Sequence, residues 1–489
     1  MLHVNSENYK DFSIPFKPIY EPYNDAASRL TDKFHKLLEL PATPKMGPRY
    51  RFLIASFLAA FQAIKFNDNH LLSIGLRNAA YTEFPEVGWR TIRKVYDALI
   101  DKQIISLYQL GTVEFTNNKN DPSPDGVRDD AFTLVKVPTL CVVDDSIIND
   151  DDFWEAEFIE VGRPLVAVGK YQSKLNRHWL KVDNKPTPKL PANQLEDEFG
   201  KSYTKAVKEV ERLNAYWKRN PICIPKRDRT RNLSYKRYAA CASRIYHQGS
   251  MQKGGRFYGL WTTVRKEDRK TATINGNATV QIDIAASQPT LFSCFMGEKM
   301  IYDSWTDIYQ NIVDQIPPSA AKAFGKDHRR AKVKQVIMEL IGVGRPSKAA
   351  PERSSYKVSD TEEYSFSEEA WGTKPQSEFV LYCNIAKYVI PALQRLDSKL
   401  GYDTHFLSYH EANIMHETLL ALMKKDIVAY PLHDCLIVEH GNEQAATDTY
   451  RTTINDYCKR VFKVGFNVSV PLTIERQGQD KETIAGYYY

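Results

Sequence analysis

The segment 429–439, AYPLHDCLIVE, constrains the fold of this chain more than any other stretch. It places His433 and Asp434 between two short apolar runs, Val428–Leu432 and Leu436–Val438. Apolar runs of this length that are rich in Val, Ile and Leu are typical of strands. The segment therefore predicts a β-hairpin with an ionisable pair at its tip. A carboxylate there is well placed to bind a metal, although a solvated turn accounts for the same pair if nothing else in the chain agrees.

A second carboxylate stands near the end of another predicted strand. The run Thr279–Ile284, TVQIDI, alternates apolar and polar residues and carries Asp283. The residues after it, Gln288–Met296, favour a helix. Both acidic residues are therefore expected where a strand gives way to solvent.

Between the two carboxylates lies a basic helical segment, His328–Ile341, HRRAKVKQVIMELI. Arg330 and Lys334 are four residues apart, so they share one face of a helix. In phosphoryl transfer, paired carboxylates hold Mg²⁺ ions roughly 3.5–4 Å apart, and cationic side chains neutralise the phosphates. This combination predicts a site for two divalent cations and a triphosphate.

The order and spacing of these residues resemble the family A DNA polymerases and their relatives, the single-subunit phage-type RNA polymerases. Those families carry a metal-binding Asp at a strand end, a fingers helix of the form Arg-x-x-x-Lys, and a hairpin with His-Asp followed by apolar residues and a Glu. The matching residues here are, in that order, Asp283, Arg330 with Lys334, and His433-Asp434 with Glu439.

Three further matches extend the resemblance over residues 253–479. Asp307-Ile308-Tyr309 is similar to the tripeptide that precedes the fingers helix, and Val470-Pro471-Leu472 is similar to the final palm strand. Gly255-Arg256 resembles the Gly-Arg that reaches the primer–template end.

The resemblance implies a right-hand polymerase and a role for each matched residue. Asp283 and Asp434 would bind two Mg²⁺ ions, with Mn²⁺ as a substitute. Lys334 and Arg330 would hold the triphosphate, with Lys334 as a proton donor to pyrophosphate. Arg256 and His433 would position the primer terminus, and Glu439 would support the site from farther along its strand.

The sequence also departs from the family at three positions. The DNA polymerases have a Glu five residues after the first Asp, which blocks a 2′-hydroxyl, and this chain has Gln288 there. Met338 and Gly342 replace the aromatic residues of the fingers helix, and Lys332 is a rival of Lys334 for the phosphate. The sequence therefore does not choose between dNTPs and NTPs.

Length and composition suggest two to four domains in a protein of 489 residues with a net charge of +6. No stretch approaches the roughly 20 apolar residues of a membrane span, and the first residues lack the layout of a secretion signal. We therefore expect a cytoplasmic protein without membrane contact. The seven cysteines contain no Cys-x-x-Cys pair, which argues against a zinc site or a disulfide framework.

The N-terminal part predicts a partly irregular arm over residues 1–45 and a winged helix-turn-helix over 46–116. Tyr50–Phe66 is an apolar helix, and a short helix is expected near Leu71–Asn78. The winged-helix order continues with a helix over Val87–Ile105 and apolar runs at Ile104–Tyr108 and Thr112–Phe115.

Basic residues on the Val87–Ile105 helix, Arg90, Arg93 and Lys94, lie largely away from its apolar face. They could contact a DNA groove or its phosphates. An ordinary three-helix module, or a winged helix that binds replication partners, explains the same pattern.

Residues 117–195 are expected to form a linker and connecting region. The part over 117–130 has a turn-forming composition, Leu134–Val143 favours a strand, and the acidic run Asp144–Glu157 favours a solvated face. The acidic pattern of a proofreading exonuclease is not found, so we expect no proofreading domain.

Residues 196–280 are predicted to form a thumb-like segment that leads into the palm. From Lys218 to Lys270, fifteen Lys and Arg residues, Arg269 among them, are interleaved with aromatic residues and face only three acidic ones. Basic side chains neutralise phosphates and aromatic faces stack on bases, so we expect contact with a primer–template. A surface helix pair with core aromatics is the alternative.

The remaining residues, 281–489, are expected to form the palm, with the fingers inserted at about 298–408. Pro346–Gln376 reads as an excursion of the fingers. The helix over Tyr409–Met423 precedes the hairpin, and the roles of His410, Glu411 and His416 within it are not assigned.

The predicted fold class is α+β, a right-hand polymerase with an N-terminal, mainly helical winged-helix module. The expected function is template-directed nucleotidyl transfer, first as a DNA-directed DNA polymerase that replicates a phage or mobile element. An RNA polymerase or primase on the same palm is one alternative, and a non-catalytic DNA-binding replication or regulatory protein is the other. The expected partners are a DNA primer–template and nucleoside triphosphates.

Overall fold

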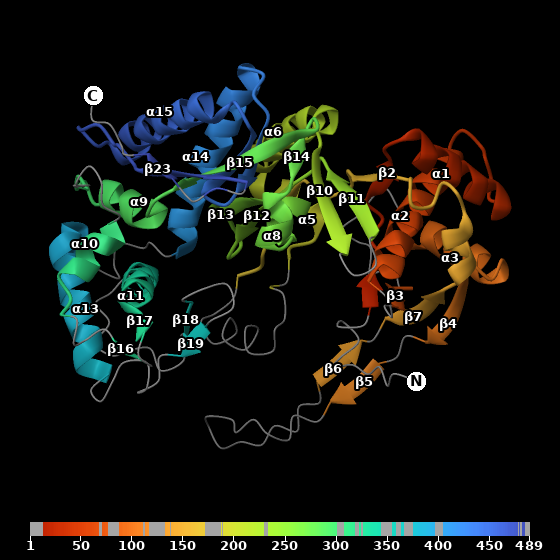
Figure 1. Cartoon of the computed structure of the whole chain (residues 1–489), viewed down its shortest axis with the longest axis horizontal. Helices are drawn as coiled ribbons and strands as arrows, with labels where there is room; N and C mark the ends of the chain where they lie inside the picture. The colour runs from red at the N-terminus through yellow and green to blue at the C-terminus, as the bar shows by residue number, and fades with distance from the viewer. Residues whose placement is uncertain are drawn as a thin grey trace.

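The computed structural model contains two hydrophobic cores, one in an N-terminal unit and a larger one in the rest of the chain (Figure 1). The residues that the structure describes are 13–67, 71–76, 88–110, 113–116, 133–136, 138–171, 187, 189–228, 233–300, 308–317, 322–323, 326–343, 355–357, 363–365, 375–396, 404–477, 479 and 482–484.

The N-terminal unit packs three helices on a four-stranded sheet. The helices are α1 (Asp25–Leu37), α2 (Gly47–Phe66) and α3 (Trp89–Asp101). The sheet has the order β1 (Ser13–Pro15), β3 (Leu71–Ile74), β7 (Thr139–Val143), β4 (Ile105–Gln109). A hairpin of β5 (Val113–Thr116) and β6 (Thr133–Lys136) projects from the connection between β4 and β7 (Figure 1).

Three expectations for this unit are corrected. The predicted arm contains α1, which begins after Asn24, whose side chain accepts a hydrogen bond from the Ala27 amide at 2.9 Å. The residues Leu71–Ile74 form a strand because the short run LLSI pairs on both sides. The strand β7 completes the same sheet, so the unit extends beyond residue 116.

The acidic run after β7 is not simply a solvated face. It includes the 3₁₀ turn η2 (Asp145–Asn149), and its carboxylates pair with the first two helices. Asp152 pairs with Arg29 and Asp150 pairs with Lys33, both at 2.5 Å. The run therefore fastens the end of the N-terminal unit to α1.

The main sheet has ten strands and holds the hairpin predicted from the sequence. Its order is β2 (Tyr20–Pro22), β8 (Phe158–Glu160), β11 (Leu233–Ala239), β10 (Ile222–Asp228), β14 (Thr273–Ile274), β15 (Asn277–Ile284), β21 (Cys435–Glu439), β20 (Ala429–Leu432), with β22 (Leu472–Arg476) on β15 and β23 (Glu482–Ile484) on β22. Neighbours are antiparallel except β8 and β11. The segment expected to be thumb-like supplies β10, β11 and β14 to this sheet, and these strands bury Ile222, Ile224, Ala239 and Ile274 in the larger core.

An aromatic cluster shows why that segment is drawn into the core. Trp217 stacks on Tyr430 of the hairpin with ring centroids 5.2 Å apart, and Trp261 meets the same ring edge-on at 4.7 Å. Both indole N–H groups donate to hairpin carbonyls, Trp217 to Ala429 at 2.9 Å and Trp261 to Pro431 at 2.7 Å. These contacts fix the hairpin against α6 (Lys201–Arg219) and α7 (Leu260–Thr263).

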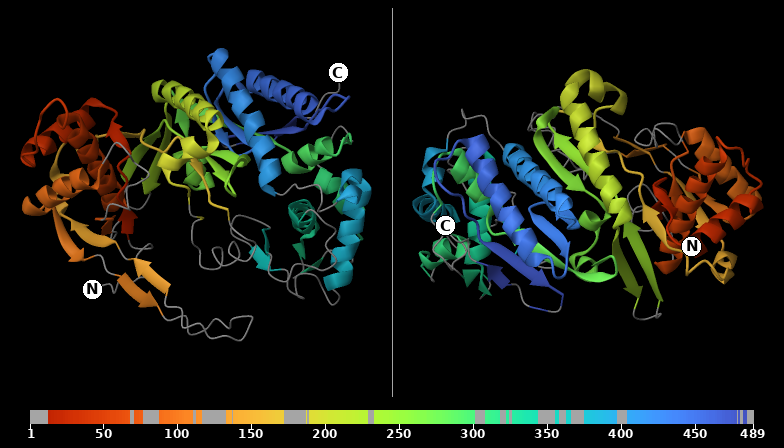
Figure 2. Two further views of the ribbon diagram at one scale, coloured as in Figure 1. Left: turned by 180° about the vertical axis from the view of Figure 1, so that it is seen from behind. Right: turned by 90° about the horizontal axis from the view of Figure 1, so that it is seen from above.

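Three long helices, α6, α14 (Thr404–Lys424) and α15 (Glu443–Phe462), lie side by side in the view from above (Figure 2). A three-stranded sheet of β13 (Ser250–Tyr258), β12 (Ser243–His247) and β9 (Val166–Val168) packs under α14. The short helix α5 (Ala192–Phe199) precedes α6, and α8 (Lys266–Lys270) precedes β14.

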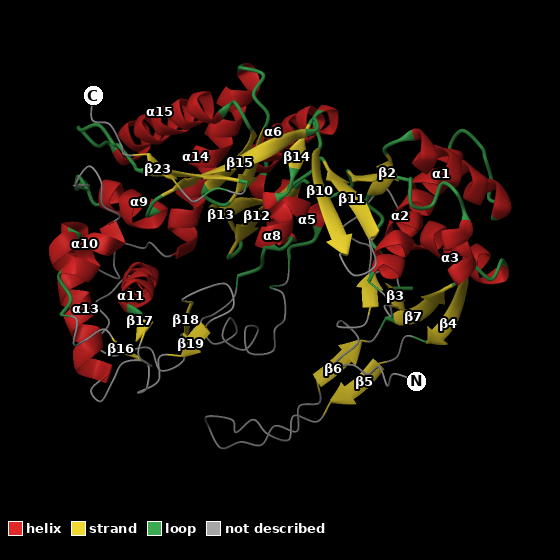
Figure 3. Cartoon of the chain, in the orientation of Figure 1, coloured by secondary structure: helices red, strands yellow, loops and turns green. Residues whose placement is uncertain are grey.

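A helical group follows α9 (Ser287–Phe295) and precedes α14 in the sequence, and it lies below α9 in Figure 3. It contains α10 (Ile308–Asp314), α11 (Arg329–Val343), α13 (Pro375–Val389) and the 3₁₀ turn η4 (Pro391–Arg395), with the small hairpins β16 (Lys322–Ala323) with β17 (Lys326–Asp327) and β18 (Ser355–Lys357) with β19 (Glu363–Ser365). Most of the predicted excursion over 346–376 lies outside the described residues.

No helix in the described part of the chain is long and apolar enough to cross a membrane. All seven cysteines are buried free thiols.

Candidate active site

Hydrogen-bonded pairing brings the two predicted carboxylates together where two neighbouring interior strands of the main sheet end. Asp283 of β15 lies opposite Cys435 of β21, and Asp434 is the residue immediately before Cys435. On its other side, Asp283 lies opposite Thr473 of β22. This register follows from the apolar residues Val280, Ile282 and Ile284, which face the core and leave Asp283 on the other face.

The hairpin tip is a two-residue turn made by His433 and Asp434. Leu432 pairs with Cys435 across the turn, and His433 has a positive φ of 61°. The Tyr450 hydroxyl, from α15, donates to the Asp434 carbonyl at 2.8 Å. The turn is thus held from behind, which fixes the direction of the Asp434 side chain.

His433 is a neutral imidazole at the hairpin tip. Burial, together with the charges of Arg256 and Arg269, lowers the pKa of His433 to about 4. The Tyr258 ring meets the imidazole edge-on at 5.8 Å. His433 can therefore donate or accept a hydrogen bond at neutral pH without adding charge to the site.

Arg256 is held beside the carboxylates by Glu411 of α14. The Arg256 guanidinium donates to the same Glu411 oxygen through Nε at 2.8 Å and through a terminal nitrogen at 2.6 Å. The Ser287 hydroxyl donates to the other oxygen at 3.1 Å. A bulge at Gly254 and Gly255, with φ of 76° and 78°, aims the arginine there.

Glu411 belongs to the candidate site although the sequence did not assign it. The sequence of the helix did not show which of its polar residues belongs to the site. The position of β13 decides which helical residue contacts Arg256. The one available signal was its spacing ahead of the His-Asp turn on a helix predicted to pack there.

The site carries an excess of negative charge. Burial, and then the charges of Glu411 and Asp283, raise the pKa of Asp434 well above its ordinary value. Burial and the charge of Asp283 likewise raise the pKa of Glu411, against the opposing effect of Arg256 and Ser287. The Arg256 guanidinium offsets only part of this, because it lowers the pKa of Asp434 and Glu411 while burial and neighbouring charge raise both. A bound cation would relieve the repulsion further.

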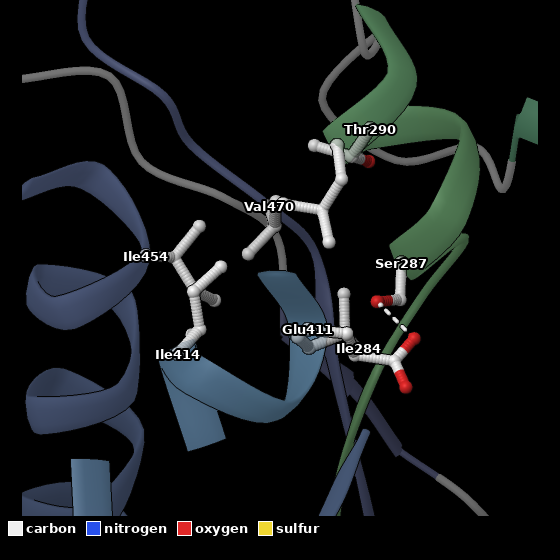
Figure 4. Close-up of a pocket in the computed structure, with 8 residues that line it drawn as sticks. Ile284, Ser287, Thr290, Glu411, Ile414, Ile454 and Val470 are labelled. Carbon is white, nitrogen blue, oxygen red and sulfur yellow. Dashed lines mark hydrogen bonds between the residues drawn. The ribbon is translucent and has the colours of Figure 1, made fainter. Parts of the chain in front are cut away.

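Close packing behind the site explains why burial dominates these shifts. A cavity of about 10 Å³ separates Glu411 from the apolar side chains of Ile414, Ile454 and Val470 (Figure 4). That space is no larger than one water needs. The Glu411 carboxylate is directed away from it, towards Ser287 (Figure 4).

A pocket of about 360 Å³ opens in front of the carboxylates. Asp283 and Asp434 line it together with two cationic side chains from α8, Lys266 and Arg269. Arg269 is oriented by hydrogen bonds to the carbonyls of Trp261 and Val264, at 3.3 and 3.1 Å. The pocket therefore brings two cationic side chains and the two predicted metal ligands together.

The other predicted phosphate-binding residues lie on α11. Lys334 and Arg330 are exposed, and the Arg330 guanidinium stands 5.6 Å from the Tyr309 ring centroid. The rival Lys332 is buried, with its ammonium 6.0 Å from the Tyr382 ring centroid. Of the two lysines, only Lys334 is accessible to a nucleotide.

The remaining predicted residues belong to several different elements. Gln288, in the first turn of α9, is buried, and its side-chain oxygen has no hydrogen-bond partner within the described residues. Glu439 lies at the far end of β21, where Asn277 donates to it. Asp307 lies outside the described residues. Arg90, Arg93 and Lys94 belong to the N-terminal unit and are exposed.

The donor set fits a magnesium site only in part. No group of three or more His, Cys, Asp or Glu side chains with metal-binding geometry occurs in the part of the chain that the structure describes. Mg²⁺ in nucleotide-processing sites commonly takes one or two carboxylates and completes its shell with phosphates and water. Asp283 and Asp434, whose repulsion raises the pKa of Asp434, match that pattern.

Comparisons with known proteins add little to this geometry. No family model matches the chain, and no curated protein matches it. The chain is similar to the POL domain of Pol1 from M. smegmatis, solved in complex with a DNA primer–template and dNTP, with 10% sequence identity and a TM-score of 0.28. That match covers 59% of this chain and 55% of the other, so the chain spans about half of that structure's length. A TM-score this low carries no argument.

Proposed function

We propose that the protein is a template-directed nucleotidyltransferase, and first a DNA-directed DNA polymerase without a proofreading domain. The observation that supports this most is the pairing of β15 with β21. It brings Asp283 and Asp434 together at the ends of neighbouring strands, in a pocket that Lys266 and Arg269 also line. Adjacent carboxylates with facing cations suit phosphoryl transfer, in which positioning and charge stabilisation supply most of the catalysis.

Asp283 and Asp434 are the proposed metal ligands. When bound there, two Mg²⁺ ions, or Mn²⁺ in their place, supply Lewis-acid chemistry at the primer hydroxyl and at the phosphate oxygens. Arg256, held by Glu411, and neutral His433 position the primer terminus. Lys334 and Arg330 bind the β- and γ-phosphates.

The proposed reaction forms one bond and breaks another at the same phosphorus. The primer 3′-oxygen attacks the α-phosphorus of the nucleotide, and the proton of the hydroxyl passes to water. The bond between the α-phosphorus and the oxygen that bridges to the β-phosphate breaks. Lys334 gives a proton to the departing pyrophosphate. Arg256 and His433 hold the attacking end still while this occurs.

A second candidate, an RNA polymerase or primase on the same site, is favoured by Gln288. The DNA polymerases that the sequence resembles carry a Glu at this position to block a 2′-hydroxyl. Gln288 is neutral, so it has no carboxylate with which to exclude a ribose in this way. Both sugars therefore belong in any assay.

A non-catalytic DNA-binding protein is the third candidate. Burying Asp434 beside Asp283 and Glu411 raises its pKa and destabilises the fold. A protein without catalysis gains nothing from that arrangement, so we rank this candidate last.

Primer extension tests the proposal. A labelled primer annealed to a longer template is incubated with Mg²⁺ and either all dNTPs or all NTPs, and DNA binding is measured in parallel. We expect extension by the wild type, none by Asp434→Ala, and nearly unchanged DNA binding in that variant, because binding depends on many phosphate contacts.

The matched control for Asp434→Ala is Asp456→Ala, which removes an exposed carboxylate of α15. It should extend the primer as the wild type does. Loss of both extension and binding in Asp434→Ala would indicate misfolding, and full extension by that variant would refute the proposed metal ligand.

A further inference from the structure

A face of the N-terminal unit, well away from the carboxylates in sequence, has the layout of a duplex-binding site. The described elements follow one another as helix α2, strand β3, helix α3 and strands β4 and β7, with the β5–β6 hairpin between the last two. The sheet places β7 between β3 and β4. From β3 onward the described elements follow the order of a winged helix, which presents one helix to DNA, while residues 77–87 just before α3 lie outside the described residues.

The buried face of α3 accounts for its apolar residues. Ile92, Val95, Tyr96 and Leu99 are spaced three and four apart and are all buried in the N-terminal core. The opposite face is therefore free of any packing role.

That outer face is cationic in its first half. Arg90, Arg93 and Lys94 are exposed, while the acidic residues Asp97 and Asp101 follow later in the helix. Arg93 pairs with Asp97 at 2.7 Å and stands 5.5 Å from the Tyr96 ring centroid. Recognition helices contact base edges and phosphates with their N-terminal residues, and this is where the cations of α3 lie.

The unit is joined to the rest of the molecule by more than its linker. The strand β2 belongs to the main sheet, and the Tyr20 amide donates to Ser56 of α2 at 3.0 Å. Lys226 of β10 donates to Asn67, just after α2, at 2.6 Å. A duplex held by α3 would therefore be held at a set position relative to the carboxylates.

We propose that α3 binds the major groove of duplex DNA, in a second nucleic-acid site that reads sequence and brings the carboxylates to a chosen place on a template. The site needs no primer end and no nucleotide. It goes beyond the proposed polymerase activity and does not depend on it.

Binding to a blunt 30-base-pair duplex of random sequence tests the site. The full chain is titrated by fluorescence anisotropy at several salt concentrations, without metal or nucleotide. The double variant Arg90→Gln/Lys94→Gln should bind about ten-fold more weakly. Its slope of log affinity against log salt should fall by about 0.9, because Lys94 contributes one phosphate contact, worth roughly 0.9, and Arg90 reads a base edge.

The matched control is Lys201→Gln/Lys208→Gln, which removes two exposed cations from α6 and changes net charge equally. It should bind the blunt duplex as the wild type does. An equal loss in both double variants would mean a general charge effect, and no loss in the α3 variant would mean that α3 does not hold the duplex. Either result overturns the proposal.

Selection from a random duplex pool tests the reading of sequence. The wild-type chain should enrich a short consensus, and Arg90→Gln should lose it. A pool that stays random would refute sequence reading. Asp434→Asn should enrich the same consensus as the wild type, so this result separates the α3 site from the catalytic proposal.

Discussion

At the scale of single residues, the buried carboxylate cluster destabilises the fold, and a cation bound at the proposed site would offset this. The pKa of Asp434 is raised in the folded protein, so its ionised form opposes folding above the ordinary carboxyl pKa of about 4. As the pH falls through the raised pKa, the carboxyl is protonated and this destabilisation disappears. Mg²⁺ should remove it at neutral pH.

Asp434→Asn should therefore stabilise the metal-free protein by roughly 1–3 kcal/mol at pH 8. The gain should shrink as the pH is lowered towards 5, and it should vanish when Mg²⁺ and a nucleotide are added. Urea unfolding under these conditions measures it. An Asn variant less stable than the wild type at pH 8 without metal would contradict this account.

Glu411 is a positioning residue, and its two obvious variants should differ. Glu411→Ala leaves the half-buried Arg256 without its partner and should cost about 3 kcal/mol. Glu411→Gln keeps an acceptor for Arg256 and should cost much less. Urea unfolding distinguishes the two variants. KM for the primer–template tests the positioning role, which predicts a raised KM in both. Equal stability losses would show that charge alone matters.

At the scale of elements, the hairpin and β15 were predictable from their apolar runs. A shift of the pairing by one residue would move Val280 and Ile282 out of the core, so the register is fixed. Short or polar elements were not predictable. The strand β3 was expected to be helical because LLSI is too short to show a period. The strands β10 and β11 were not predicted within the segment 196–280, because its basic composition hides the few apolar residues, Ile222 and Ile224 among them, that β10 buries in the core.

The helix α11 offers a direct comparison of two lysines. Lys334→Gln should raise KM for the nucleotide by 10- to 100-fold, as expected for a lost charge-assisted hydrogen bond of about 1.5–3 kcal/mol, and should leave stability unchanged. Lys332→Gln removes a buried cation near Tyr382 and should lower stability instead. Steady-state kinetics and urea unfolding measure both. A reversed pattern would move the phosphate contact to Lys332.

At the scale of the whole molecule, one sheet gathers strands from both ends of the chain. Strands from residues 20–22 to 482–484 share it, so the two carboxylates are set by contacts that are distant in sequence. This is why sequence could locate Asp283 and Asp434 but not the pocket that they share with α8. The residues that line the pocket depend on which helix packs in front of the sheet. No local sequence pattern predicts that packing.

Charge on two faces of the molecule should matter differently for primer binding. Lys266 lines the pocket of the carboxylates, whereas Lys201 lies on α6 in another surface hollow. Lys266→Gln should weaken primer–template binding several-fold and reduce the salt slope by about 0.9. Lys201→Gln should change neither quantity in the same anisotropy titration. Equal effects would mean that no particular face binds the primer–template.

The central claim is that the carboxylate pair catalyses template-directed addition. The most direct measurement offers one nucleotide at a time, in both sugar forms, to a primer on four templates that differ only in the next base. We expect the wild type to add one nucleotide, only opposite the complementary base, and to release an equal amount of pyrophosphate. The variants Asp283→Asn and Asp434→Asn should add no nucleotide. Addition that ignores the template base, or that survives either substitution, would contradict it.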